Sequence, residues 1–384
     1  MKQPTVIVIG AGIVGASCAC YLAKAGAKVR VLERAPQAAT GATAKSAAGV
    51  RHQFSHAANV LMSRYSVEQF RNFEALTGFD AAYRPVGYLF LLEQQSQAWR
   101  EQLAMQRALG ARVERLDPVQ VLQRFPYVNV ENLCAAHFGM DDGVVDPHAV
   151  TLGYLRVAKE YGAELLLNSE VMALQSQANA WQLQVNQDGK LQTLQADVVV
   201  NAAGAFAGEI GKRAGLDIPV LPYRRNVYAT APLADFPHPT PLIVDVQSGV
   251  WLRSEGERFI MGLSNLHEPA GDNQAVDWQW FETLVEHALP RFPFLGQAGL
   301  DRKACWAGLY AITPDHAPII GEMASAPGFV NACGFSGHGV QHSPATGLMV
   351  AEEVIEGGIH SFDSSLFRYE RFAKGELVLE HNVV

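Results

Sequence analysis

The chain has 384 residues, of which 49% are hydrophobic and 18% charged, and its formal net charge is −8. Its length exceeds the usual size of one domain and predicts two, while its negative charge argues against nucleic acid or an anionic membrane surface as a partner. The 5 cysteines are scattered without a CxxC pattern. This argues against zinc or iron–sulfur sites, so no metal is expected, and it indicates reduced thiols in a cytoplasmic protein.

The most apolar stretch, residues 5–29, is long enough to suggest a membrane span. Its glycines and Lys24 fit a strand, a turn and a buried helix better, so we expect no integral membrane segment. Only residues 1–4 precede the first strand, and we therefore expect no signal peptide.

The amino-terminal segment has the pattern of a dinucleotide-binding βαβ unit. An apolar strand at residues 6–9 leads into Gly10-x-Gly12-x-x-Gly15, and Glu33 ends the next apolar run. Gly10 permits a tight turn, Gly12 lets the backbone approach a pyrophosphate, and Gly15 lets the helix pack on the sheet. The helix N-terminus can then hold phosphates, while the carboxylate of Glu33 can accept hydrogen bonds from ribose hydroxyls.

The next segments predict helices, one strand and a small-residue loop that can approach a ligand closely. Their ranges are 13–25 for a helix that Gly26 ends, 38–49 for the loop, 59–76 for a helix, 88–92 for a strand, 94–109 for a helix and a short helix ending near 125–126. Asp146 and Pro147 have the residue types of an N-cap and a first helical position, which predicts a helix to about residue 161.

The second half predicts an alternation of strands and helices. The ranges are 164–167 for a strand followed by a short extended segment at 170–171, 181–185 and 191–194 for a hairpin around Asp188-Gly189, 196–201 for a buried strand, 226–230, 250–253 and 258–263 for an antiparallel sheet, 277–289 for a helix that covers it, and 328–332 for a strand. The Gly-rich turn 334–339 precedes a helix to about residue 356, where Gly357 follows. Ser343 and Pro344 resemble its N-cap and first position.

We infer two interleaved domains from this order. The nucleotide-binding domain is assigned residues 1–85, 145–222 and 305–384, and a domain with an antiparallel sheet is assigned residues 86–144 and 223–304.

The Gly-rich turn at residues 334–339 favours FAD over NAD as the dinucleotide. FAD is long, and its reduced ring carries negative charge, which a second helix N-terminus can stabilise. A tight strand–helix connection is the alternative, but glycine at 3 of these 6 positions is more than a simple turn needs.

Several motifs resemble the D-amino-acid oxidase superfamily of FAD enzymes, in the branch of sarcosine oxidase, glycine oxidase and the proline dehydrogenase β-subunit. They are GLYAITPD at residues 308–315, GFSGHGVQ at 334–341, GVRHQF at 49–54 and VVNAAG at 199–204, together with the amino-terminal fingerprint. The similarity covers essentially the whole chain.

This resemblance implies an α/β fold, α+β overall, in which a glutathione-reductase-type FAD-binding Rossmann domain is interleaved with an antiparallel-sheet substrate domain. It also implies oxidation of the C–N bond of a small amino acid or N-methyl amine by hydride transfer to flavin N5. The residues expected to bind FAD are Gly10, Gly12, Ile13, Val14, Gly15, Glu33, Arg34, Thr43, Ala44, Ser46, Gly49, Val50, Val171, Ala202, Ala203, Gly204, Gly308, Gly334, Ser336, Gly337, His338, Gly339, Val340 and Gln341.

Five residues are candidates for the substrate site. Arg51 matches the carboxylate-binding arginine of the sarcosine oxidases, and a guanidinium grips a carboxylate bidentately, although a surface arginine is the alternative. His52 is either an electrostatic neighbour of the flavin or a satisfied core histidine. His338 lies inside the Gly-rich turn, where it either acts or only shapes the loop. Tyr310 and Gln341 are expected to line the pocket, with an aromatic core residue as the alternative for Tyr310.

Departures from the sarcosine oxidases bear on the cofactor and the electron acceptor. Gly308 stands where those enzymes attach flavin through cysteine, and Cys305 lies earlier, so non-covalent FAD is expected. Ile260 stands where they carry a lysine that activates dioxygen, and Arg258 is the nearby charge. Loss of that cation favours a dehydrogenase that passes electrons to a carrier over an oxidase that uses dioxygen. Gln341 replaces a lysine that helps bind carboxylate, which weakens a strict sarcosine assignment.

Two other functions remain open. The same fold can oxidise a 2-hydroxy acid or a related alcohol, for which His52 or His338 would have to act as a base. The chain can also be a flavin-bearing subunit of a hetero-complex, as the β-subunits of this branch are.

Overall fold

The computed structural model describes residues 3–178 and 180–380. It has two halves in space, each assembled from separate parts of the sequence, and a six-stranded sheet forms one of them. The strand order is β18-β19-β12-β1-β2-β8, and all neighbours are parallel except β18, which runs antiparallel to β19. The bounds are β1 (Thr5–Ile9), β2 (Lys28–Leu32), β8 (Glu164–Leu166), β12 (Val198–Asn201), β18 (Ile319–Met323) and β19 (Ala326–Cys333). The carboxyl ends of β1, β12 and β19 therefore meet at one edge of this sheet, where open α/β folds bind ligands.

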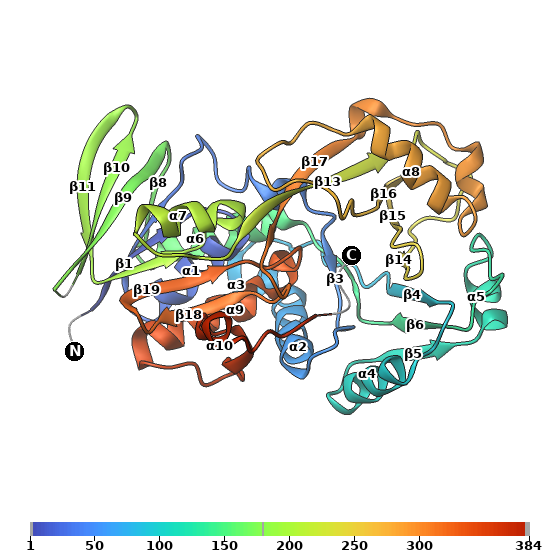
Figure 1. Cartoon of the computed structure of the whole chain (residues 1–384), viewed down its shortest axis with the longest axis horizontal. Coiled ribbons are helices and arrows are strands. Elements are labelled where there is room, and N and C mark those ends of the chain that lie inside the picture. Colours follow the sequence, from blue (N-terminus) through green and yellow to red (C-terminus); the bar gives the residue numbers. More distant parts are fainter. Residues whose placement is uncertain (1–2, 179, 381–384) are drawn as a thin grey trace.

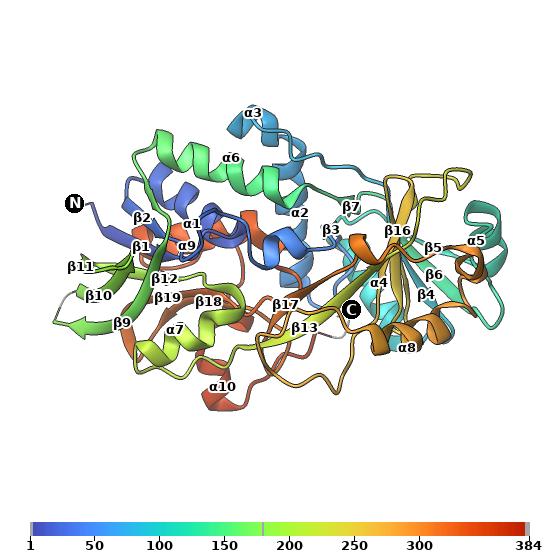
Figure 2. The same ribbon diagram turned by 90° about the horizontal axis from the view of Figure 1, so that it is seen from above.

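Both faces of the six-stranded sheet are covered, because alternate residues of its buried strands point to opposite sides. Val6 and Val8 belong to the core beneath helices, whereas Ile7 and Ile9 belong to the core on the other face. The helices are α1 (Ile13–Lys24), α6 (Pro147–Glu160) and α9 (Gly339–Glu356), and the other face carries the antiparallel strands β9 (Ser169–Gln177), β10 (Ala180–Gln187) and β11 (Lys190–Ala196) with α7 (Ala207–Arg213). Figures 1 and 2 show these layers.

The other half of the molecule is built on an eight-stranded sheet of order β17-β13-β16-β15-β14-β4-β6-β5. Its strands are β4 (Tyr88–Leu92), β5 (Val113–Leu116), β6 (Ala135–Gly139), β13 (Leu221–Ala229), β14 (Leu242–Asp245), β15 (Trp251–Glu255), β16 (Arg258–Gly262) and β17 (Trp306–Ile312). α8 (Trp278–Ala288) and α5 (Pro118–Arg124) share a hydrophobic core with it. β13 and β17 run between the two halves in both ribbon views (Figures 1 and 2).

The remaining elements connect these two halves or flank them. They are β3 (Gly49–Val50) paired with β7 (Gly143–Val144), α2 (Ala57–Arg71), α3 (Phe73–Thr77), α4 (Gln97–Ala108) and α10 (Glu370–Lys374).

Most predicted elements are confirmed. In the hairpin around Asp188-Gly189, the residue types predicted from the sequence fit the backbone conformation of the turn. Both residues have positive φ, 49° and 81°, as the favoured two-residue hairpin turns require. The predicted antiparallel sheet also forms, but it is not purely antiparallel, since β4 and β14 pair in parallel. Four of its strands, β5, β6, β14 and β17, were missed, as was β18 of the six-stranded sheet, because they are short or lack clear alternation.

Two helix predictions were wrong in their bounds. The helix expected over residues 59–76 is divided at Asn72, whose side-chain amide donates to the carbonyl of Glu68 at 2.9 Å. The last long helix begins at Gly339, before Ser343 and Pro344, so that proline lies inside the helix. The helix tolerates it because the Ser343 hydroxyl donates to the carbonyl of Val340 at 2.9 Å, which is the acceptor that the proline nitrogen leaves without a partner.

Two of the predicted domain boundaries fall in or next to β13 and β17, the strands that run between the two halves of the molecule. The boundary at residue 222 lies within β13, and β17, which pairs with β13, lies in the range assigned to the nucleotide-binding domain. The division itself stays a prediction.

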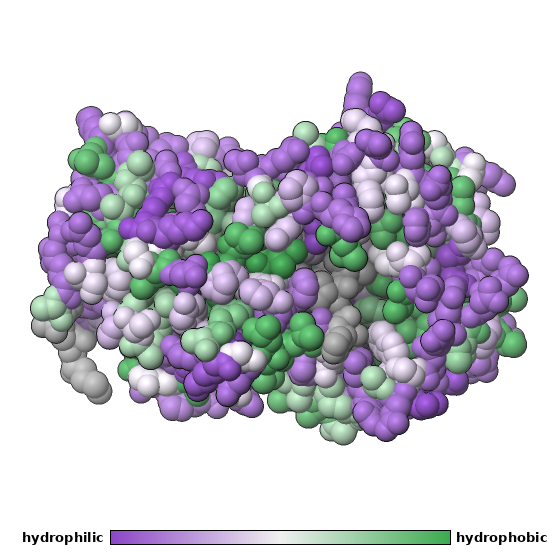
Figure 3. All heavy atoms as spheres, in the orientation of Figure 1, coloured by the Kyte–Doolittle hydropathy of each residue, from purple (hydrophilic) through white to green (hydrophobic). Residues whose placement is uncertain are grey.

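On the face shown in Figure 3, hydrophilic side chains cover most of both halves, and hydrophobic ones gather near the middle. Within residues 3–178 and 180–380, no helix has both the length and the apolar character needed to cross a bilayer.

A buried ion pair holds the carboxy-terminal segment against the six-stranded half. Arg371 donates to both carboxylate oxygens of Asp315 at 2.6 and 2.9 Å, and also to the carbonyl of Ala317. Burial acts to raise the pKa of Asp315, but the hydrogen bond and charge of Arg371 outweigh it and the pKa is lowered from 3.8.

Replacing Arg371 with Met should lower the free energy of unfolding by about 3–5 kcal/mol, because it leaves a buried carboxylate unpaired. Since the pKa of Asp315 is lowered, the stabilisation by the pair is complete above pH 3.8 and is lost as the pH falls through the lower native value. Urea unfolding with excess FAD measures this. The exposed pair Arg30–Glu164 provides the control, since Arg30→Met should cost less than about 1 kcal/mol. Equal losses in the two variants would contradict the prediction.

Candidate functional site

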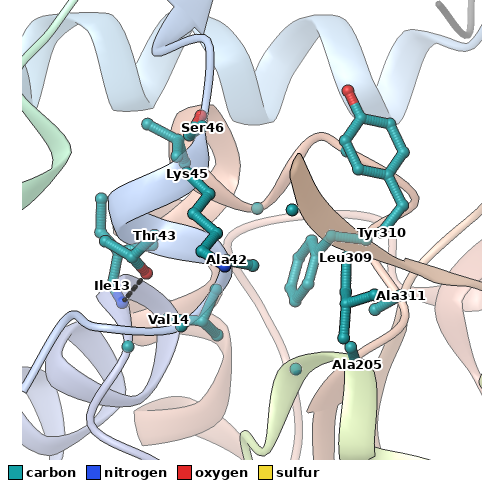
Figure 4. A pocket seen from close by; sticks show the side chains of 18 of the residues that line it. Ile13, Val14, Ala42, Thr43, Lys45, Ser46, Ala205, Leu309, Tyr310 and Ala311 are labelled. Atoms are coloured by element: carbon teal, nitrogen blue, oxygen red, sulfur yellow. Dashed lines mark hydrogen bonds between the residues drawn. The ribbon is translucent and has the colours of Figure 1, made fainter. Parts of the chain in front are cut away.

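A cavity of about 440 Å³ lies at the shared edge of β1, β12 and β19 and extends to β13 and β17. One wall is the 3₁₀ turn η1 (Ala42–Lys45), and the facing wall includes Leu309, Tyr310 and Ala311 of β17, as Figure 4 shows. The Tyr310 side chain points away from Ala205 in this view. The cavity therefore reaches both halves of the chain, as a long ligand with a reactive end requires.

The turn between β1 and α1, which lines the cavity, depends on glycine at two positions. Gly10 has φ +103°, and a Cβ there would lie 2.6 Å from the carbonyl oxygen of Ala202. A Cβ on Gly15 would lie 2.0 Å from the carbonyl oxygen of Gly10. The strand ends and the first helix therefore approach through backbone alone, as the fingerprint predicts.

The N-terminus of α1 is open toward the cavity. Its N-cap is Gly12, which has no side chain to cap the helix. The Ile13 amide donates to the Thr43 hydroxyl at 3.0 Å, and Gly12, Ile13, Val14 and Thr43 all line the cavity (Figure 4). Backbone donors and the positive end of the helix dipole make this corner suitable for a pyrophosphate.

Glu33 lies at the end of β2 and is fixed by its own backbone surroundings. Its carboxylate accepts hydrogen bonds from the amides of Ala11 at 2.8 Å and Ala35 at 2.9 Å. Next to it, the guanidinium carbon of Arg34 lies 3.9 Å from the centre of the Phe206 ring. A carboxylate held here suits ribose hydroxyls and disfavours a 2′-phosphate.

A second open helix N-terminus faces the other part of the cavity. The N-cap of α9 is His338, which makes no side-chain cap, and the first turn contains no acidic residue. The preceding Gly337 has φ +98°, and a Cβ there would lie 2.5 Å from Cε2 of Tyr310. The positive end of α9 thus points toward this part of the cavity, and negative charge there would be stabilised.

Arg51 lines the cavity and is almost fully buried. Its guanidinium carbon lies 4.0 Å from the centre of the Phe54 ring, and Nη1 donates to the carbonyl of Gln53. Its backbone amide donates to Oε1 of Gln341 at 2.8 Å, which connects it to α9. The alternative of a surface arginine is therefore wrong, and Gln341 lines the cavity as expected.

His338 lines the cavity within hydrogen-bond distance of Arg51, with 3.1 Å between Nε2 and Nη2. Burial lowers the pKa of His338 well below its usual value, and the positive charge of Arg51 lowers it further. The neighbouring His342 is also buried, which lowers its pKa to about 3. Both imidazoles are therefore neutral at physiological pH.

His52 does not line the cavity. Its ring Nδ1 donates to Oδ1 of Asp142 at 2.6 Å, and its backbone amide donates to the same oxygen at 2.9 Å. The structure thus places this residue as a satisfied core histidine, which is one of its two interpretations from the sequence.

Sequence reasoning missed a second arginine in the cavity. Arg225 of β13 pairs with Gly308 of β17, so Arg225 and Tyr310 are diagonal neighbours on one face of the sheet. The guanidinium carbon of Arg225 lies 5.3 Å from the centre of the Tyr310 ring. Only the long-range pairing of β13 with β17 brings these residues together, and neither strand position carries a local motif.

The two positions compared with the dioxygen-activating lysine place no charge in the cavity. Ile260 is buried in an apolar cluster of the eight-stranded sheet, and Arg258 forms an ion pair with Asp301 at 3.0 Å. Lys45 does line the cavity, and its amine donates to Gln274.

Comparison with known proteins decides the family. A family model described as DAO, FAD dependent oxidoreductase, matches residues 5–353. The chain belongs to the DAO family of FAD-dependent oxidoreductases. It is 30% identical to FAD-dependent oxidoreductase domain-containing protein 1 of Xenopus laevis, over 100% of this chain and 85% of that protein. It is 26% identical to human mitochondrial sarcosine dehydrogenase, over 95% of this chain and 41% of that protein.

The solved structures agree with this assignment. L-proline dehydrogenase from P. horikoshii superposes with a TM-score of 0.89 at 29% identity, covering 98% of this chain and 99% of the other. The predicted fold class is therefore confirmed, and the cofactor of this family is FAD.

The cavity fits FAD, with two open helix N-termini and a carboxylate spaced along it. Most residues expected to bind FAD line it: Gly10, Gly12, Ile13, Val14, Glu33, Arg34, Thr43, Ser46, Gly49, Val171, Ala202, Ala203, Gly204, Gly308, Ser336, Gly337, His338, Gly339, Val340 and Gln341. Gly15, Ala44, Val50 and Gly334 are not among the lining residues. Gly15 and Gly334 allow close packing, since a Cβ on Gly334 would lie 2.5 Å from Cγ2 of Thr313.

In this DAO-family chain, Gly308 leaves no room for a flavin-attaching cysteine. A Cβ at this position would lie 2.9 Å from Cβ of Lys45. Cys305 is turned elsewhere, since its sulfur accepts from the amide of Ala229 at 3.3 Å, and no cysteine of the described chain lines the cavity. Within that part of the chain there is also no group of His, Cys, Asp and Glu that could hold a metal.

Precipitating the purified yellow protein with acid should release all of its flavin into the supernatant, because no cysteine thiol lines the cavity. Absorbance of the supernatant and the pellet near 450 nm measures this. A yellow pellet after washing would show a covalent bond and contradict the prediction.

Replacing Glu33 with Gln should raise the Kd for FAD by about 10- to 100-fold, because a charged acceptor of two backbone amides and of the ribose is lost. Fluorescence quenching of added FAD measures the affinity. Glu164→Gln is the control, since that carboxylate lies exposed on the adjacent strand β8 and outside the cavity. If both variants retain FAD equally, the assigned role of Glu33 is wrong.

Proposed function

We propose that this chain is a dehydrogenase that oxidises the C–N bond of a small amino acid or an N-methyl amine carrying a carboxylate. FAD, when bound, supplies the acceptor for the hydride equivalent that leaves the carbon next to nitrogen. The protein's own residues then have to hold the carboxylate, exclude water and position the substrate.

The contact between Arg51 and His338 is the observation that carries this proposal. A guanidinium can only donate, so Nε2 of His338 is the acceptor and its lone pair is engaged. A hydroxy acid would need a base to remove its hydroxyl proton, whereas an amine needs none once it is deprotonated. His52 is bound to Asp142 away from the cavity and offers no substitute. The geometry therefore favours an amine over a 2-hydroxy acid or another alcohol.

Arg51 is the residue proposed to hold the carboxylate. It combines a bidentate donor set with nearby aromatic rings, those of Phe54 at 4.0 Å and Phe90 at 5.4 Å. These rings keep water away from the guanidinium and strengthen its attraction for an anion. Its link to Gln341 keeps it in place relative to the start of α9.

The preference for a dehydrogenase rests on two supports. The relatives that are 26% and 29% identical to this chain include proteins named sarcosine dehydrogenase and L-proline dehydrogenase. In addition, apolar Ile260 and ion-paired Arg258 occupy the strand in which oxidases of this branch carry their lysine. The electron acceptor is then a carrier, and reduced enzyme should transfer electrons to a quinone faster than to dioxygen.

An anaerobic screen tests the function. The holoprotein is mixed with amino acids, N-methyl amino acids and matched 2-hydroxy acids, and loss of flavin absorbance is followed. Bleaching by amines but not by hydroxy acids supports the proposal, and the opposite selectivity would overturn it.

Replacing Arg51 with Met should raise the apparent Kd of the reducing amine by about 10- to 100-fold, because charged hydrogen bonds to its carboxylate are lost. Rapid-mixing measurements of flavin reduction against amine concentration separate this Kd from the limiting rate. Arg51→Lys should recover part of the affinity, since it keeps the charge but not the planar donor pair. An unchanged Kd in the Met variant would show that another residue holds the carboxylate.

A further inference from the structure

Arg225 is a cavity-lining cation whose charge has no carboxylate partner in the described chain. Its Nη1 donates to the carbonyl of Arg224 at 2.9 Å, while its Nε is buried without a hydrogen-bond partner. No carboxylate of residues 3–178 and 180–380 lies within ion-pair distance of it. Arg225 is one of the residues that line the cavity.

Arg224, the preceding residue of β13, differs from Arg225 because it has carboxylates within ion-pair distance. Arg224 forms ion pairs with Glu268 and Asp277, each at 3.0 Å. Successive residues of a strand point to opposite faces, so Arg224 and Arg225 lie on opposite faces of β13. Within the described chain, only Arg224 of the two has carboxylates within ion-pair distance, whereas the charge of Glu268 acts on Arg225 from farther away.

Arg225 shares Tyr310 with Arg51. Burial raises the pKa of Tyr310, and the positive charges of Arg225 and Arg51 act against that rise, so both charges lie close to this ring. Desolvation lowers the pKa of Arg225 itself and outweighs the opposing charge of Glu268, so water solvates this cation poorly. Two poorly solvated cations in one cavity are costly unless a ligand brings negative charge to each of them.

The acidic side chains that line the cavity come from other elements than these two arginines. The carboxylates among the lining residues are Glu33, Glu170 and Glu209, which belong to the surroundings of β2, β9 and α7. That is the end assigned to the adenosine part of FAD. The walls from β13 and β17 add Arg225, Asn226 and Tyr310 but no acid.

We propose that Arg225 and Tyr310 form a second anion subsite, and that the substrate is a small amine carrying two acidic groups. This inference rests on the proposed function, in which Arg51 holds the carboxylate at the reacting carbon. Arg225 then holds the second acidic group, and the Tyr310 hydroxyl is the neutral donor beside it. A substrate with one carboxylate leaves a desolvated guanidinium unpaired and therefore binds less tightly.

Binding of unreactive acids to the holoprotein tests the subsite without turnover. Propionate is compared with malonate, succinate and glutarate by titrating the change in flavin visible absorbance. We expect at least one diacid to bind about 10-fold or more tightly than propionate, because charged hydrogen bonds form at both arginines. Arg225→Met should remove that advantage and change the affinity for propionate by less than about 3-fold, and Arg225→Lys should keep part of it.

Arg258→Met is the matched control, since Arg258 lies on the adjacent strand β16, pairs with Asp301 and does not line the cavity. It should leave the diacid preference unchanged. Thermal unfolding and FAD content of each variant show whether it has folded, and Arg225→Lys provides the result if Arg225→Met has not.

The outcomes separate this inference from the proposed function. If propionate binds as tightly as every diacid, or if Arg225→Met weakens both classes equally, the second subsite is wrong, while bleaching by monocarboxylate amines would still support amine oxidation. If the diacids bind as expected but no amine bleaches the flavin, the subsite stands and the proposed reaction fails.

Discussion

The contact between three backbone segments at the edge of the six-stranded sheet is the constraint on which the site depends. The end of β1, the end of β12 and the start of α1 approach so closely that a Cβ at Gly10 would meet the Ala202 carbonyl and one at Gly15 would meet the Gly10 carbonyl. Because no side chain intervenes, the amides at the start of α1 lie at the cavity surface. The same approach leaves Glu33, at the end of β2, beside those amides.

The N-terminus of helix α9 also faces the cavity, at a different place from that of α1. The α9 N-terminus follows β19, and α1 follows β1, so two helix dipoles converge on one cavity from parallel strands on either side of β12. Arg51 is tied to this helix through Gln341 and lies beside His338. Arg51, which is proposed to hold the substrate carboxylate, lies just after β3 and is thus linked by a hydrogen bond to the helix whose N-terminus faces the cavity.

Local patterns in the sequence predicted what depends on neighbouring residues. The fingerprint around Gly10 and the hairpin at Asp188-Gly189 rest on short segments, and the structure places both as expected. The expectation that Gln341 lines the cavity came from the family resemblance, and the structure agrees with it. The wrong helix start at Ser343 shows the limit of that approach. Serine before proline has the residue types of a helix start, but here the serine hydroxyl satisfies a carbonyl inside the helix.

What the sequence could not provide is any feature created by pairing between distant strands. Arg225 has no motif around it, and it becomes part of the cavity only because β13 pairs with β17. Likewise, only the distant Asp142 decides that His52 is a core histidine. These tertiary contacts have energies of the same order as local preferences, so local patterns alone do not determine them.

The ring of Tyr310 joins the two parts of the site into one packing unit. It lies against Gly337 of the turn before α9, under the influence of Arg225 from β13 and of Arg51 after β3. A ligand that attracts Arg225 therefore acts on a ring that also supports the turn next to the cofactor. Since this ring packs closely on Gly337, the wall proposed to recognise the substrate and the turn proposed to stabilise negative charge on the flavin are in direct contact. Substrate preference and flavin environment are for that reason expected to change together when this wall is altered.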